Sequence, residues 1–174
     1  IIVPGFVTLE SSIGAWGPFL ASHGIVTMTI GTNNIFEQPE ARANALLDAM
    51  TSLKEEQNRL SSPLNSRLNT ENIALGGWSM GAGGAQIGAK MDSSIKVVIA
   101  LCPWLETGLI SEEYLNHETP ILFISAEYDA IANASLHATP QYELSSETTP
   151  KLIYEVSNGG HTVANYPTSG NGEV

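Results

Sequence analysis

Residues 76–84 read Gly-Gly-Trp-Ser-Met-Gly-Ala-Gly-Gly, and this run constrains the fold more than any other stretch of the chain. The apolar run Ile73–Leu75 before it suits a short buried strand, and Ala82–Met91 after it suits a helix. Gly77–Gly81 fits Gly-x-Ser-x-Gly, the pattern of a strained strand-to-helix turn that presents a serine at the top of a sheet. An ordinary glycine-rich turn is the alternative. The strand before and the helix after favour Ser79 as a nucleophile.

Strand and helix signals alternate along the rest of the chain. The expected strands are 1–3, 25–30, 73–75, 95–101, 121–125 and 151–156, and the expected helices are 11–21, 82–91, 135–144 and one running from Pro39 to a break at 61–63. Such alternation indicates parallel strands joined by crossover helices, so we expect an α/β sheet covered by helices on both faces. With no internal repeat and no second domain to be seen, residues 1–174 are interpreted as a single domain.

The spacing after the serine motif leaves little room for a lid. Residues 102–119 join two expected strands, and a parallel crossover needs a dozen or more residues by itself. We therefore expect an uncovered cleft, which would suit a bulky or polymeric substrate. The chain opens on Ile1-Ile2-Val3, already inside an expected strand, and it ends on a polar stretch. We interpret it as the core of a longer domain, truncated at both ends.

Composition favours an enzyme over a protein that binds nucleic acid or membranes. Hydrophobic residues make up 43% of the chain and charged residues 14%, which excludes a disordered or coiled-coil chain. The formal net charge is −11, and the seven basic residues are scattered, so no basic patch for nucleic acid or an anionic membrane is expected. No run approaches the roughly 20 apolar residues of a membrane span. The single Cys102 allows no internal disulfide and is expected to be a buried packing residue.

A serine nucleophile needs a base, and the base needs an orienting acid. On this type of fold the chain order is serine, then an acid, then histidine, each placed after a strand. Asp129 follows the strand expected at 121–125, and His161 follows the strand expected at 151–156. Ser79, Asp129 and His161 are therefore the candidate catalytic triad.

Other acids and bases along the chain are weaker candidates. Glu127 could replace Asp129 as the acid. His137 is expected on a helix too close to that acid, and His117 precedes the strand that carries it. His23 lies at a helix end, where a cap or a surface position is the simpler interpretation.

Acyl transfer also needs two N–H donors for the oxyanion that forms on the substrate. Met80, the residue after the nucleophile, would supply one, and Phe6, in the loop after the first strand, would supply the other. Trp78, Trp104 and Ile131 each lie at the carboxyl end of an expected strand, so with the Phe6 ring they could line one apolar cleft. Core packing is the alternative for each of them. This chemistry calls for no cofactor and no metal.

These residues resemble the bacterial cutinases and poly(ethylene terephthalate) hydrolases of the α/β-hydrolase fold. The matching stretches are Ile2–Phe6, Gly14–Pro18, Leu20–Gly24, Gly77–Gly81, Pro103-Trp104, Glu127–Ala132 and Gly159–His161. The resemblance implies a secreted, monomeric serine esterase whose cleft accepts polyester chains. It also implies the triad and the oxyanion donors given above, with Trp104 and Ile131 as a substrate clamp. A small-molecule esterase or lipase without polymer activity is the alternative, and a non-catalytic binding protein is a further one.

Overall fold

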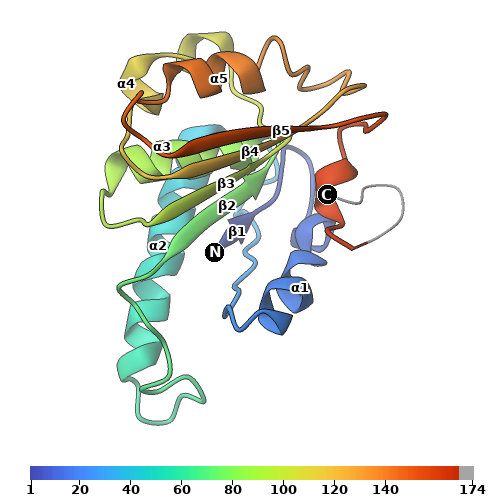
Figure 1. The fold of residues 1–174 in the computed structure, drawn as a ribbon. Coiled ribbons are helices and arrows are strands. Elements are labelled where there is room, and N and C mark those ends of the chain that lie inside the picture. The colour runs from blue at the N-terminus through green and yellow to red at the C-terminus, as the bar shows by residue number, and fades with distance from the viewer. Residues whose placement is uncertain (169–174) are drawn as a thin grey trace.

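Five parallel strands form the sheet at the centre of the computed structural model, which describes residues 1–168 (Figure 1). The strands are β1 (Ile2–Val3), β2 (Ala74–Trp78), β3 (Val97–Leu101), β4 (Ile121–Ala126) and β5 (Lys151–Val156). They lie side by side in the order of the sequence, and every neighbouring pair is parallel. The carboxyl ends of all the strands therefore meet at one edge of the sheet. The last residues of the predicted domain, 169–174, lie outside the described part.

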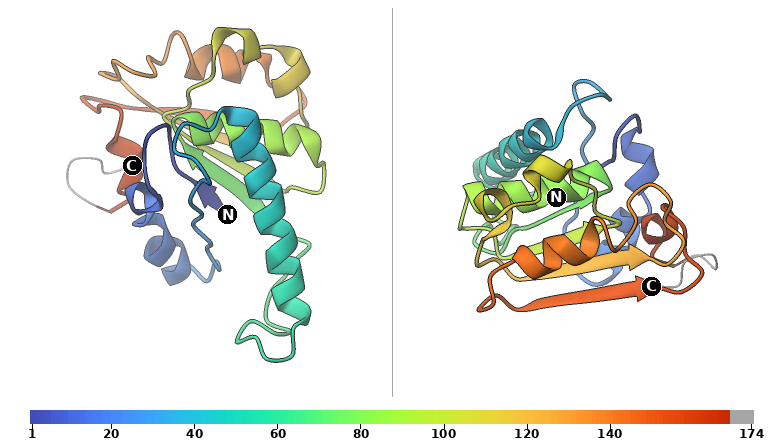
Figure 2. Two further views of the ribbon diagram at one scale, coloured as in Figure 1. Left: turned by 180° about the vertical axis from the view of Figure 1, so that it is seen from behind. Right: turned by 90° about the horizontal axis from the view of Figure 1, so that it is seen from above.

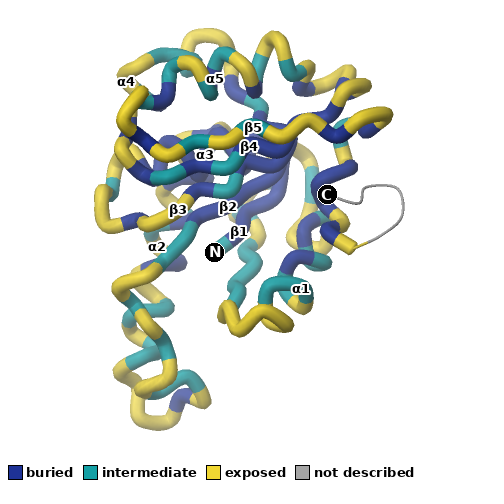
Figure 3. The backbone as a smooth tube through the Cα atoms, viewed as in Figure 1, coloured by how far each residue is buried: buried dark blue, intermediate teal, exposed yellow. Residues whose placement is uncertain are grey.

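One face of the sheet is covered by helices that also pack against one another (Figure 2). The helices on this side are α2 (Pro39–Asn58), α3 (Met80–Met91), α4 (Glu112–Leu115) and α5 (Ala138–Leu144). Helix α3 is built largely from glycine and alanine, and its residues from Met80 to Ala89 are all buried. Small side chains let α2 and the sheet approach α3 closely from both sides. Figure 3 shows the resulting core as a band of buried backbone through β2, β3 and β4.

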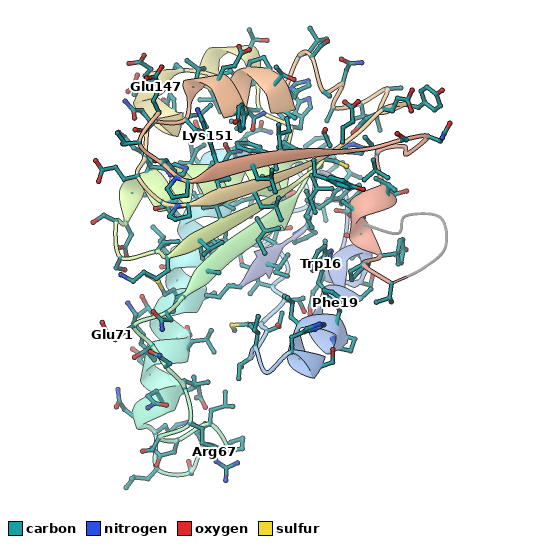
Figure 4. All side chains as sticks on the ribbon, in the orientation of Figure 1. Trp16, Phe19, Arg67, Glu71, Glu147 and Lys151 are labelled. Atoms are coloured by element: carbon teal, nitrogen blue, oxygen red, sulfur yellow. The ribbon has the colours of Figure 1, made fainter. Side chains whose placement is uncertain are left out.

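The opposite face is covered by α1 (Trp16–Ser22) and two short 3-10 helices, η1 (Glu10–Ile13) and η3 (Val163–Asn165). Trp16 and Phe19 of α1 pack edge to face beneath the sheet (Figure 4), with ring centroids 5.7 Å apart. The Trp16 indole N–H donates to the Ala164 carbonyl oxygen at 2.8 Å, which joins α1 to η3. Helices on both faces of a parallel sheet were expected from the sequence, and this expectation is confirmed.

The prediction of a strand at residues 25–30 is wrong. Within residues 1–168, its only strand-like pairing is an isolated bridge between Ile2 and Thr29. In this bridge the Ile2 N–H donates to the Met28 carbonyl oxygen and the Ile30 N–H donates to that of Ile2. Strand β1 is two residues long, so it offers this segment too little backbone for a ladder. The apolar run 25–30 therefore follows the sheet edge without joining it.

Two of the expected helices differ from the prediction at their ends. The helix expected at 11–21 is divided into η1 and α1, and Gly17-Pro18 lie in the first turn of α1, where a proline loses no hydrogen bond. The helix expected at 135–144 begins only at Ala138. The Asn133 side chain accepts from the backbone N–H of Ser135, and this local turn delays the helix.

The segment expected to be too short for a lid holds η2 (Thr107–Leu109) and α4. Its buried Leu105 and Leu115 pack against Ala43 of α2 and Ile87 of α3. The segment therefore lies against these helices. A separate apolar cavity of about 380 Å³ opens at the other end of the sheet, beside Ile1, Ile25 and Leu68. Within residues 1–168, no helix has the length and apolar character needed to cross a membrane.

Candidate active site

Ser79 occupies the tight turn that joins β2 to α3. Its backbone angles are φ 55° and ψ −121°, in a region that residues other than glycine rarely adopt. A β-carbon at Gly77 would lie 2.2 Å from the backbone of Gly81, and one at Gly81 would lie 2.5 Å from the carbonyl oxygens of Val3 and Pro4. Only glycine fits at either position. The flanking glycines therefore allow both the turn and the close passage of the neighbouring strand.

The structure brings Ser79, Asp129 and His161 into one hydrogen-bonded chain. The Nε2 atom of His161 lies 2.9 Å from the Ser79 Oγ atom, and its Nδ1 atom lies 2.7 Å from Oδ2 of Asp129. The three side chains follow the carboxyl ends of β2, β4 and β5, which lie at the same edge because the sheet is parallel. This arrangement can pass a proton from the hydroxyl to the imidazole while the carboxylate holds the ring.

Asp129 is buried, and its second oxygen is also occupied. Oδ1 accepts from the backbone N–H groups of Ile131 at 2.9 Å and Ala132 at 2.7 Å. Burial alone would raise the pKa of the carboxyl, but the hydrogen bonds from His161 and these two amides outweigh it, and the pKa is lowered. Asp129 is therefore held as a carboxylate facing the imidazole.

Glu127, the alternative acid, has a different partner. Its Oε2 atom accepts from the backbone N–H of Asn158 at 2.8 Å. One residue further on, the Tyr128 N–H donates to the Gly159 carbonyl oxygen at 2.8 Å. The carboxylate of Glu127 thus helps to join the loop of Asp129 to the loop that leads into His161.

Two main-chain N–H groups lie free beside the nucleophile. Within residues 1–168, the N–H groups of Phe6 and Met80 donate to no protein acceptor. Met80 directly follows Ser79, and a β-carbon at Gly5 would lie 2.9 Å from the Ser79 Cβ atom, so the loop of Phe6 passes directly alongside. Unpaired donors in such a place are available to a negatively charged oxygen.

The residues expected to contact substrate fall into two groups. The side chains of Phe6 and Ile131 are open to solvent, with exposed fractions of 43% and 63%, and Trp104 is half-buried. Trp78 is only 6% exposed, and its indole N–H donates to the His161 carbonyl oxygen at 2.8 Å. Trp78 therefore has little surface to offer a substrate and instead supports His161.

The remaining histidines do not contact the nucleophile. His137 is the N-cap of α5, outside the helix on which it was expected, and its ring lies 5.8 Å from the ring of Trp104. Burial lowers the pKa of His137. His117 is buried and His23 is exposed. The tilted approach of the His137 ring to Trp104 was missed in the sequence, because it depends on where α5 begins.

Cys102 is buried, as expected from the sequence, but its place beside the triad was not foreseen. Its Sγ atom and one ligand atom each of Asp129 and His161 all lie within 4.8 Å of one another. Burial and then the Asp129 charge raise the pKa of the thiol to about 12, so it stays neutral. No other group of three potential metal ligands occurs in the part of the chain described. A neutral thiol beside an already paired Asp129 and His161 does not favour a metal.

The parallel sheet, the serine at the strand–helix turn, and the acid and histidine after later strands define a protein of the α/β-hydrolase fold. The chain belongs to the PET hydrolase-like family, whose model matches residues 1–173. This agrees with the resemblance seen in the sequence.

Three relatives illustrate the range of the matches. The chain is 36% identical to Lipase 1 of a Moraxella species, over 95% of this chain and 48% of that protein. It is 35% identical to Cutinase est2 of Thermobifida alba, over 94% and 52%, respectively. It is 33% identical to a bis(hydroxyethyl) terephthalate hydrolase of Streptomyces coelicolor, over 97% and 54%. The chain therefore spans about half the length of these curated relatives.

Proposed function

We propose that this protein is a serine hydrolase that cleaves the ester bonds of polyesters and of short acyl esters. The observation that carries the proposal is the hydrogen-bonded chain from Asp129 through His161 to Ser79, with separations of 2.7 and 2.9 Å. The names of two relatives, a cutinase and a bis(hydroxyethyl) terephthalate hydrolase, support a substrate of this class.

In the proposed reaction the Ser79 hydroxyl attacks the ester carbonyl carbon while His161 takes its proton at Nε2. Asp129 accepts the Nδ1–H hydrogen bond and stabilises the imidazolium. The N–H groups of Phe6 and Met80 receive the oxyanion, and each such donor is typically worth about 3 kcal/mol of transition-state stabilisation. His161 then protonates the leaving alcohol, and water releases the acyl group from Ser79 by the same steps.

The surroundings of the site favour an uncharged, apolar substrate. Phe6 and Ile131 expose apolar side chains, and Trp104 is half-buried. The formal net charge of −11 would repel a polyanion. The family resemblance supports export from the cell and action as a monomer. An ester or polyester is thus the proposed partner, without a cofactor.

A small-molecule esterase or lipase is the second candidate, because one relative carries the name Lipase 1. The two candidates differ in what they do at a solid surface. A polyester hydrolase should release soluble acids from a polyester film as well as hydrolyse p-nitrophenyl acetate. Hydrolysis of the soluble ester without any release from the film would favour the second candidate.

The triad is tested by Ser79→Ala, with Ser22→Ala on an exposed turn of α1 as the matched control. Ser79→Ala should lower kcat for p-nitrophenyl acetate by about 10⁴-fold or more and should abolish covalent labelling by a fluorophosphonate. The control should keep both. Undiminished turnover in Ser79→Ala would contradict the proposal.

A further inference from the structure

The loop that carries the Phe6 N–H is strained. Val7, the next residue, has φ 56°, which is unusual for a β-branched side chain and costs on the order of 1–3 kcal/mol. Its own N–H donates to the Ile35 carbonyl oxygen at 2.9 Å. Strain of this kind persists only where surrounding contacts hold the backbone in place. The loop of Phe6 and Val7 must therefore be held by contacts from other parts of the chain.

Arg42 of α2 holds the loop from behind. The guanidinium is fully buried and donates from Nη1 to the Pro4 carbonyl oxygen at 2.8 Å. It also donates from Nη2 to the main-chain carbonyl oxygen of Ile35 at 3.2 Å and from Nε to that of Glu37 at 3.1 Å. One side chain thus fixes the peptide that precedes Gly5 together with the carbonyl that receives the Val7 N–H.

Thr8 forms a hydrogen bond to the peptide unit that joins Gly5 to Phe6. Its Oγ1 atom donates to the Gly5 carbonyl oxygen at 2.8 Å. That carbonyl belongs to the same planar peptide unit as the Phe6 N–H, because the unit joins Gly5 to Phe6. A bond to the oxygen restrains rotation of the unit, so it also restrains the direction of the N–H. Hydrogen bonds in a chain also polarise one another, which makes the N–H a better donor.

We propose that Thr8 is a positioning residue for the oxyanion donor, acting through the Gly5–Phe6 peptide. The inference rests on the proposed function, since it assigns the free Phe6 N–H to the oxyanion. Thr8 touches no reacting atom. Its hydroxyl sets the direction of the N–H before the substrate arrives, so that little reorganisation is needed in the transition state.

The test removes the hydroxyl and keeps the shape of the side chain. Thr8→Val should lower kcat for p-nitrophenyl acetate by about 5-fold, the value of one neutral hydrogen bond, with KM little changed. Thr8→Ser should restore kcat. Thr51→Val on the exposed surface of α2, where the hydroxyl donates to Leu47, makes the same substitution and should leave kcat unchanged.

A second substrate separates positioning from a general loss of structure. Sulfur accepts hydrogen bonds weakly, so the thionoester analogue depends less on the oxyanion donors. Thr8→Val should therefore slow the oxoester more than the thionoester. Equal losses for both substrates, or kinetics equal to those of the wild type, would overturn the inference while Ser79 chemistry stands. A wild-type protein without ester turnover or fluorophosphonate labelling would overturn the proposed function as well.

Discussion

The indole N–H of Trp78 donates to the main-chain carbonyl oxygen of His161 at 2.8 Å, and the two rings lie 5.1 Å apart at an angle of 43°. Trp78 directly precedes Ser79, whereas His161 lies 83 positions further along the chain. The end of β2 thus carries the candidate nucleophile and also holds the loop of its candidate base. Trp78 links the two from a buried position.

This relationship predicts that Trp78→Phe lowers kcat while leaving most of the ring packing in place. Losing one hydrogen bond to a partly buried carbonyl should reduce kcat for p-nitrophenyl acetate by about 5- to 10-fold, because His161 is held less firmly. Trp16→Phe is the matched control, since it removes an indole bond to the nearby Ala164 carbonyl without touching the imidazole. The control should lower thermal stability but change kcat less. Equal effects of the two substitutions on kcat would argue against a role in positioning His161.

Asp129→Asn should lower kcat by about 10⁴-fold with little effect on folding. The amide keeps the size of the carboxyl group but cannot stabilise the imidazolium, and its NH₂ group disfavours the required tautomer of His161. Steady-state kinetics and circular dichroism measure the two effects. Glu127→Gln is the control, because that carboxylate contacts Asn158 instead of His161. A larger loss of kcat in the control would reassign the acid.

Gly77→Ala should destabilise the fold by about 1–3 kcal/mol or more, because the new β-carbon would lie 2.2 Å from the backbone of Gly81. Urea unfolding measures the change. Gly31→Ala, at an exposed position, makes the same substitution where nothing lies within 4 Å, and it should be neutral or slightly stabilising. Unfolding free energies of Gly77→Ala equal to those of the wild type would show that the turn can relax.

The burial of His117 should make the folded protein less stable in acid. Its ring is buried, and burial lowers the pKa to about 4, from about 6.5 in an unfolded chain. Between these values the unfolded chain binds the extra proton. The free energy of unfolding should therefore fall as the pH drops from about 6.5 to about 4, by up to about 3 kcal/mol from this residue.

Urea unfolding at several pH values, followed by tryptophan fluorescence, tests this expectation. His117→Gln removes the titrating group, so its free energy of unfolding should depend less on pH over this range. His23→Gln, at an exposed position, is the matched control. An unchanged pH dependence in His117→Gln would show that other groups are responsible.

Features that depend on near neighbours in the chain could be predicted from the order of the residues. The turn around Ser79 could be predicted because glycine at 77 and 81 is a local steric requirement. Strand β5 was predicted with its observed bounds, and β4 to within one residue, because runs of strand-forming residues end at clear turn signals. The order of Ser79, Asp129 and His161 then followed from the rule that each lies after a strand.

Which of these groups meet, and which contacts support them, depends on how distant segments pack in the folded chain. Residues 25–30 have a strand-like sequence but lie beside a strand of two residues, so they cannot form a ladder. Trp78 was expected to face substrate, yet its N–H is paired with a carbonyl from the loop after β5. The bond from Thr8 to Gly5 depends on a loop held by Arg42 from another element. The bonds made by Trp78 and Arg42 join segments far apart in sequence, so no local pattern of residues encodes them.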